Sequence, residues 1–180
     1  MKPLSQAKKT LIAVRPEALP IVFRTLGTEF DIVVCHTLQD AKFHLDEQVG
    51  LIVCSVHFDD GATFDFLSHA KGNPDTRSIP FFVVVGEAEH YSKPILAGIR
   101  SAAGIVGAQG FIELSRLQRE VGEEKANAQL RQVIRHFLAQ DDLGTSDNNR
   151  RSVLQQEMHW MTTPPTKPSQ KTAQAALPEV

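Results

Sequence analysis

The sequence predicts one doubly wound α/β domain with a five-stranded parallel sheet, and two patterns support this prediction. Short runs of apolar, often β-branched residues recur along residues 10–140. Segments with the 3.6-residue period of amphipathic helices separate these runs. The alternation implies right-handed β-α-β crossovers, because parallel strands need a long connection that a helix can supply. In such a fold, ligands and chemistry lie beyond the carboxyl ends of the strands.

Five apolar runs are expected to form the strands. They are short and have no polar face, which is typical of strands that helices cover on both sides. In chain order, the runs are residues 11–14, 31–35, 51–54, 81–85 and 110–112.

The expected helices lie between these runs and after the last one. Apolar residues at i, i+3, i+4 and i+7 mark a helix over residues 19–26, with Gly27 at the position of a C-cap. Thr37 and Asp40 resemble a capping box, which would open a helix that includes Leu45. The apolar residues that mark the three later helices are Phe64, Leu67 and Ala70; Ile95, Leu96, Ile99 and Ala103; and Leu130, Val133, Ile134, Phe137 and Leu138.

Three segments have no clear place in this alternation. Residues 1–9 are expected to be flexible. Residues 115–127 are polar and fit either a loop or an extension of the last helix, which Gly122 disfavours. Residues 141–180 are rich in Pro, Ser, Thr and Gln without periodicity, so the C-terminal tail is expected to be mostly disordered.

One apolar island interrupts this tail and could form a short helix at 150–161. It holds Met158, Met161 and the only tryptophan of the chain, Trp160. These side chains could anchor a partner, pack back on the domain, or form an incidental apolar cluster.

Composition narrows the class of protein. Apolar residues make up 42% of the chain and charged residues 22%, and the formal net charge is -2. No basic stripe is present for nucleic acid, and no apolar stretch is long enough for a membrane span. Cys35 and Cys54 each end an apolar run, which favours buried thiols over a disulfide. We therefore expect a soluble cytoplasmic protein.

Residues 51–85 resemble the middle of a response-regulator receiver domain, from the third strand to the fourth. The connection at 71–80 is especially similar, and residues 107–111 resemble the turn into the fifth strand of that family. The resemblance implies a flavodoxin-like (CheY-like) arrangement of the sheet. It covers residues 10–114 well and residues 115–140 loosely, because the last connection is longer here.

The resemblance also implies where phosphoryl chemistry should lie. Receivers use an aspartate nucleophile, acidic Mg²⁺ ligands, a hydroxyl and a lysine, which together neutralise the transferring group. The corresponding positions carry none of these groups. Arg15 and Pro16 stand at the positions of the acidic pair, with only Glu17 beside them. Ser55 stands at the position of the nucleophile, and Leu114 at that of the lysine. Val85, followed by Gly86, stands at the position of the hydroxyl. The sequence therefore predicts a degenerate receiver without metal or cofactor.

A phosphate acceptor or a metal site at the strand ends remains an alternative. Asp59 or Asp60 could act as an offset phosphate acceptor, or join Glu17 and Glu87 in a weak metal site. Turn formation and helix capping explain both aspartates equally well. His36, His57 and His90 each follow a strand and could converge on Zn²⁺, although no pair has the spacing of a structural site. Solvated loop histidines are the plainer interpretation.

The expected function is that of a non-catalytic pseudo-receiver, which acts by protein–protein contact near a two-component pathway. The resemblance implies a partner surface on the fourth helix, fifth strand and fifth helix, including Phe111 and Ile112, and this surface could also form a homodimer. Phe111 occupies the aromatic position that receivers have on the fifth strand. The alternatives are a phosphorelay regulator using Asp59 or Asp60, and a flavodoxin-like nucleotide or flavin binder.

Overall fold

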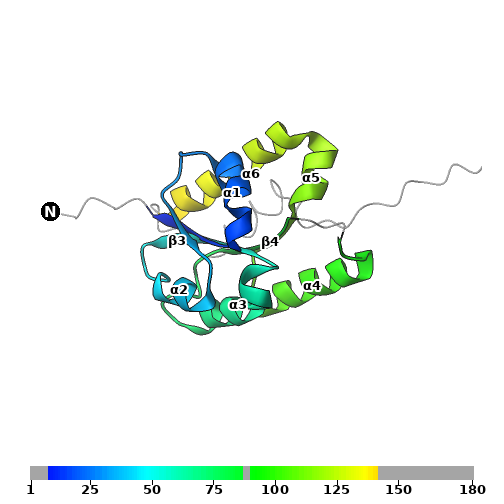
Figure 1. The fold of residues 1–180 in the computed structure, drawn as a ribbon. Coiled ribbons are helices and arrows are strands. Elements are labelled where there is room, and N and C mark those ends of the chain that lie inside the picture. The colour runs from blue at the N-terminus through cyan, green and yellow to red at the C-terminus, as the bar shows by residue number, and fades with distance from the viewer. Residues whose placement is uncertain (1–7, 87–89, 142–180) are drawn as a thin grey trace, which may run out of the picture.

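The computed structural model describes residues 8–86 and 90–141. Their centre is a five-stranded, wholly parallel sheet in the order β2-β1-β3-β4-β5 (Figure 1). The strands are β1 (Lys9–Ala13), β2 (Ile32–Cys35), β3 (Val49–Ser55), β4 (Phe81–Val85) and β5 (Gly110–Glu113). All five predicted strands are confirmed, and each end lies within two residues of the prediction.

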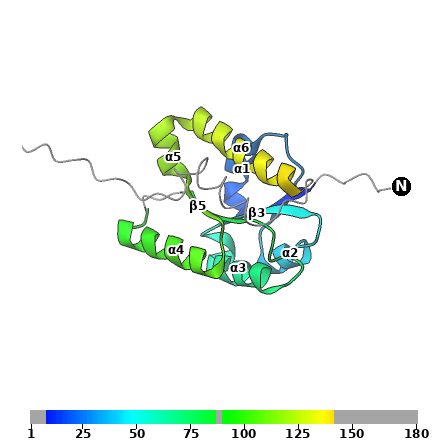
Figure 2. The same ribbon diagram turned by 180° about the vertical axis from the view of Figure 1, so that it is seen from behind.

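Helices cover both faces of the sheet, as Figures 1 and 2 show from opposite sides. One face carries α1 (Leu19–Leu26), α5 (Leu114–Val121) and α6 (Glu123–Asp141), and the other carries α2 (Leu38–Phe43), α3 (Thr63–Gly72) and α4 (Lys93–Val106). Two short 3₁₀ helices, η1 (Pro16–Ala18) and η2 (Phe58–Gly61), lie in the connections after β1 and β3. Within the described residues, no helix is both long and apolar enough to cross a bilayer.

The helix signals in the sequence proved accurate at their caps. Gly27 ends α1 with a φ of +66°, and its N–H donates to the Phe23 carbonyl at 2.8 Å. The hydroxyl of Thr37 accepts from the N–H of Asp40 at 3.1 Å, as an N-cap should. The prediction that the same helix includes Leu45 was wrong, because α2 ends at Phe43. Leu45 packs against the core from the following loop instead.

The polar stretch at 115–127 is neither a loop nor a continuous extension of the last helix. It forms α5, a break, and the first turn of α6. Gly122 makes the break with a φ of +88° and a ψ of 150°, which only glycine adopts readily. The covering of this sheet face is therefore built from two helices at an angle.

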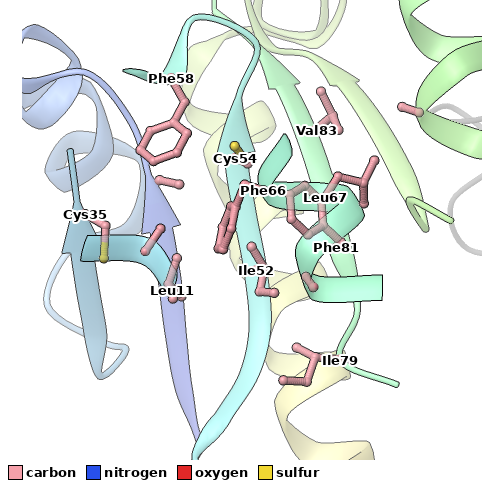
Figure 3. Close-up of a cluster of buried hydrophobic side chains, with 14 of the residues drawn as sticks. Leu11, Cys35, Ile52, Cys54, Phe58, Phe66, Leu67, Ile79, Phe81 and Val83 are labelled. Carbon is pink, nitrogen blue, oxygen red and sulfur yellow. The ribbon is translucent and has the colours of Figure 1, made fainter. Parts of the chain in front are cut away.

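The two faces bury separate cores. Between the sheet and α2, α3 and α4, the ring of Phe66 packs against the rings of Phe58 and Phe81 (Figure 3). Cys35 and Cys54 belong to this core as free, buried thiols, as expected from their positions in the sequence. Burial raises the pKa of Cys35 to about 11, which leaves its thiol protonated and unreactive at neutral pH.

The second core lies between the sheet and the helices α1, α5 and α6. Its centre is an edge-to-face pair of Phe82 on β4 and Phe137 on α6, with 5.1 Å between the ring centroids. Gly110 on the neighbouring β5 lies against the ring of Phe82, so that this position has no room for a side chain.

The side chains of Lys71 and Gln109 hold the loop before β4 against the sheet. The ammonium of Lys71 donates to the carbonyls of Ile79 and Arg77 at 2.6 and 3.1 Å, and to Oε1 of Gln109 at 3.1 Å. The same Oε1 accepts from the N–H of Phe81 at 2.7 Å, where β4 begins. The network joins the end of α3 to the starts of β4 and β5.

We predict that Gly110→Ala destabilises the fold. A Cβ at this position would lie 2.6 Å from Cδ1 of the buried Phe82 ring, so that the ring or the strand must shift. The expected loss is about 1–3 kcal/mol of unfolding free energy, as for other overpacked cores, measured by chemical denaturation.

The matched control is Gly104→Ala on α4, where a Cβ meets no atom within 4 Å. Alanine should stabilise this helix by about 0.5–1 kcal/mol. Equal effects of the two substitutions would contradict the packing argument.

A second prediction concerns pH. Burial lowers the pKa of Lys71 to about 8, against 10.5 when unperturbed. Between these values the unfolded chain binds more protons than the folded one, so the contribution of Lys71 to stability rises with pH. We therefore expect the unfolding free energy of the wild type, relative to that of Lys71→Met, to increase as the pH rises from 8 to 10. The buried thiols of Cys35 and Cys54 lower stability as the pH rises above about 9. They are present in both proteins, so their effect cancels when the two unfolding free energies are subtracted. A difference that stays constant with pH would refute the prediction.

Candidate functional site

The carboxyl edge of the sheet begins with three exposed residues after β1. Arg15 precedes η1, and Pro16 and Glu17 lie within it. Proline has no side-chain ligand, and the guanidinium of Arg15 is a permanent cation beside the only carboxylate of the three. The position of the acidic pair thus offers a divalent cation one exposed carboxylate and one repelling charge.

Ser55 ends β3 and is held in a local hydrogen-bond network. Its Oγ accepts from the backbone N–H of His57 at 3.3 Å, and its carbonyl accepts from the hydroxyl of Thr63 at 2.7 Å. The imidazole of His57 instead meets Tyr91, with 3.1 Å between Nε2 and Oη and the rings stacked at 5.6 Å. A serine nucleophile needs a base beside its hydroxyl, and the contacts of His57 give it a different partner.

Asp59 acts as a helix cap. Its Oδ2 accepts from the N–H of Leu38 at 2.7 Å, which satisfies a free amide at the start of α2. Asp59 and Asp60 both have left-handed backbone conformations, with φ of 41° and 54°. The turn and capping interpretation of the sequence therefore accounts for Asp59.

The ends of β4 and β5 offer no phosphate ligand in their predicted positions. Val85 is fully buried in the core under α3 and α4, and Leu114 is buried at the start of α5. Glu113 is paired with Arg100 and, at 3.8 Å, with Arg116. Arg116 also pairs with Glu120 at 2.7 Å, so the two guanidiniums of this cluster face two carboxylates.

The three histidines do not converge. His36 lies against β1, with 2.8 Å between Nδ1 and the Val14 carbonyl, and His57 contacts Tyr91. The interpretation of these two as solvated loop residues was wrong, because both are partly buried and bonded. Among the described residues, no three His, Cys, Asp or Glu side chains stand close enough to hold a metal ion. Glu87 lies outside the described residues.

Phe111 and Ile112 are not on the surface, which corrects their assignment to a partner surface. Each is 4% exposed, and strand alternation places them in the two different cores. The guanidinium carbon of Arg100 lies 5.2 Å from the ring centroid of Phe111 and covers it. The large apolar side chains that α4 exposes are Ile95 and Ile105.

The sequence did not predict an apolar cavity between the sheet, α1 and α6. Its volume is about 130 Å³. Val53 and Val84 contribute to its lining from β3 and β4, and they are only partly buried although both strands lie inside the sheet. Ser55, Gly86 and Leu114 line the cavity where β3, β4 and β5 end. Two of the positions that the receiver resemblance singles out, Ser55 and Leu114, therefore border an apolar space, whereas Val85 lies in the other core.

The comparisons with known proteins agree with the fold described above. No protein-family model and no curated protein sequence matches the chain. Among solved structures, the phosphorylated cyanobacterial phytochrome response regulator RcpA is similar at 14% identity, over 75% of this chain and 96% of that one, with a TM-score of 0.54. A response regulator from Hahella chejuensis is similar at 13% identity, over 67% and 90% of the two chains, with a TM-score of 0.51. The chain has the five-stranded, flavodoxin-like fold of response-regulator receiver domains.

Proposed function

We propose that the chain is a pseudo-receiver: a cytoplasmic signalling adaptor that works by protein contact and is not phosphorylated at the usual position. The observation that supports this most strongly is the absence of a charged side chain at two positions of the carboxyl edge, Ser55 and Leu114. Ser55 and Leu114 line an apolar cavity where a receiver would hold a nucleophile and a lysine. The receiver fold supports a place near two-component signalling.

Phosphoryl transfer at this edge would lack each of its electrostatic supports. Transfer to an oxygen needs Mg²⁺ and a cation to neutralise the charge on the phosphoryl oxygens. The nearest acidic residue of the β1 connection is Glu17, two positions from Arg15. Leu114 supplies no charge, and the hydroxyl of Ser55 has no base in contact with it among the described residues.

Asp59 is the strongest rival acceptor, and its bond to α2 opposes that role. Phosphorylation would convert the carboxylate to an acyl phosphate and weaken the charge-assisted bond from the Leu38 N–H at 2.7 Å. The same bond fixes the carboxylate beside α2. We therefore expect Asp59 to act as a cap and not as an acceptor.

Incubation with acetyl phosphate and Mg²⁺ tests this expectation. Intact mass spectrometry should show no added phosphoryl group on the wild-type chain, whereas a phosphorylatable receiver treated in parallel should gain one. A gain that disappears in Asp59→Ala but persists in Asp60→Ala would replace the pseudo-receiver by a phosphorelay regulator with an offset acceptor.

The partner surface that we propose lies on α4 and the neighbouring start of α5. Ile95 and Ile105 are 52% and 84% exposed, so α4 presents two large aliphatic side chains to solvent. The ion pairs of Arg100, Glu113 and Arg116 lie between α4 and α5. An apolar strip beside a fixed charge network suits a protein partner, or a second copy of the chain.

The double substitution Ile95→Glu and Ile105→Glu should abolish partner capture from the native cell, or dimer formation measured by sedimentation. The control is Phe43→Glu on α2, because Phe43 is also highly exposed, at 82%, but lies at the other end of this sheet face. Both variants should keep their stability within about 0.5 kcal/mol, since the side chains are exposed. Equal loss of binding in both would place the partner elsewhere.

A further inference from the structure

The cavity under α1 and α6 has the size and chemistry of a site for an aromatic ring. A dry cavity of about 150 Å³ lined by aliphatic residues binds benzene in another protein, and the volume here is about 130 Å³. Val22, Val53, Val84 and Val133 are among its lining residues and remain partly exposed, although they face one another across the second core. Their apolar surface lacks a covering group within the described residues.

Ile21 marks the side of the cavity that reaches solvent. It is 43% exposed and lies on α1, whereas most of the lining from the strands is buried. Thr25 and Ser55 are the two hydroxyl-bearing residues among the described residues of the lining. An entering group with one polar N–H could therefore find an acceptor at the edge of an otherwise apolar site.

We propose that the occupant of this cavity is a segment of the same chain, residues 153–161, with the indole of Trp160 inserted and Met158 and Met161 beside it. These residues belong to the 39 residues that follow Asp141, where the described structure ends. Outside 153–161, that part of the chain has only Leu143, Leu177 and Val180 as large aliphatic residues, and it has no second tryptophan. Methionine and tryptophan fill irregular apolar sites well.

The connection is long enough for this contact. Ile134 on α6 lines the cavity, and the seven residues from there to Asp141 rise about 10 Å along the helix. The eleven residues 142–152 can then span up to about 36 Å, which is more than the return path requires. A tethered segment of this length has an effective concentration near millimolar, so even a weak intrinsic affinity fills the site.

The proposal is independent of the phosphorylation state and of the α4 surface. It gives the tail a defined role, since the segment would cover the apolar face that the helices leave open. A partner that binds the segment would have to withdraw it and expose the cavity. The cavity and an external partner would therefore compete for the same segment.

Trp160 is the only tryptophan, so its fluorescence reports on the segment without a label. In the full-length chain we expect emission at shorter wavelength, and weaker quenching by acrylamide, than in a peptide of residues 142–180. Ile21→Glu places a charge at the mouth of the cavity, and it should shift the emission to longer wavelength and raise quenching toward the value of the peptide.

The matched control is Phe23→Glu. Phe23 is 52% exposed on the same helix but does not line the cavity, so this variant should keep the wild-type emission. Val133→Phe, which fills the cavity from α6, should displace the indole as Ile21→Glu does. Circular dichroism checks that all three variants remain folded.

Three results would overturn the proposal. One is emission of the full-length chain that matches the free peptide. Another is a shift that Ile21→Glu and Phe23→Glu produce equally. The third is a dependence of the emission on protein concentration, which would assign the contact to a second copy. If the indole is exposed and native mass spectrometry finds a small apolar molecule on the purified chain, the cavity belongs to that molecule instead.

Discussion

The structure depends on a sheet that is apolar on both faces, because such a sheet must be covered twice. On the side of α2, α3 and α4, the rings of Phe58, Phe66 and Phe81 pack together under the helices. On the other side, Gly122 divides the covering helix into α5 and α6. The cavity lies between α6, α1 and the strands, so the same face carries both the break and the uncovered surface.

Much of this fold follows from local pattern, and the errors follow from tertiary contacts. The five strands and the caps at Gly27 and Thr37 could be predicted, because period and cap chemistry are properties of neighbouring residues. Phe111 was assigned to a surface because a family resemblance identifies a segment but not the exposure of each side chain. Leu45 continues an apolar helical pattern, yet it packs from a loop. No local pattern encodes the gap between two helices.

The candidate site shows the same division. The residue types at Arg15, Ser55, Val85 and Leu114 are read directly from the sequence, and the resemblance alone implies what a receiver would carry there. The actual uses of Asp59, His36 and His57 could not be read in this way, because they depend on contacts with α2, with the Val14 carbonyl and with Tyr91. Asp59 and Asp60 also adopt left-handed backbone, at a cost of roughly 1–2 kcal/mol per residue. The cap on α2 offsets part of this cost.

The burial of Leu114 disfavours any charged side chain at the first position of α5. A lysine at this position would place an ammonium in an apolar lining, and a buried, unpaired charge is far less favourable than a leucine. An aspartate at Ser55 would meet the same surroundings without Mg²⁺ or a lysine to compensate its charge. A charge introduced at either position alone would therefore lack its compensating partner, and each single substitution should cost more than the two together.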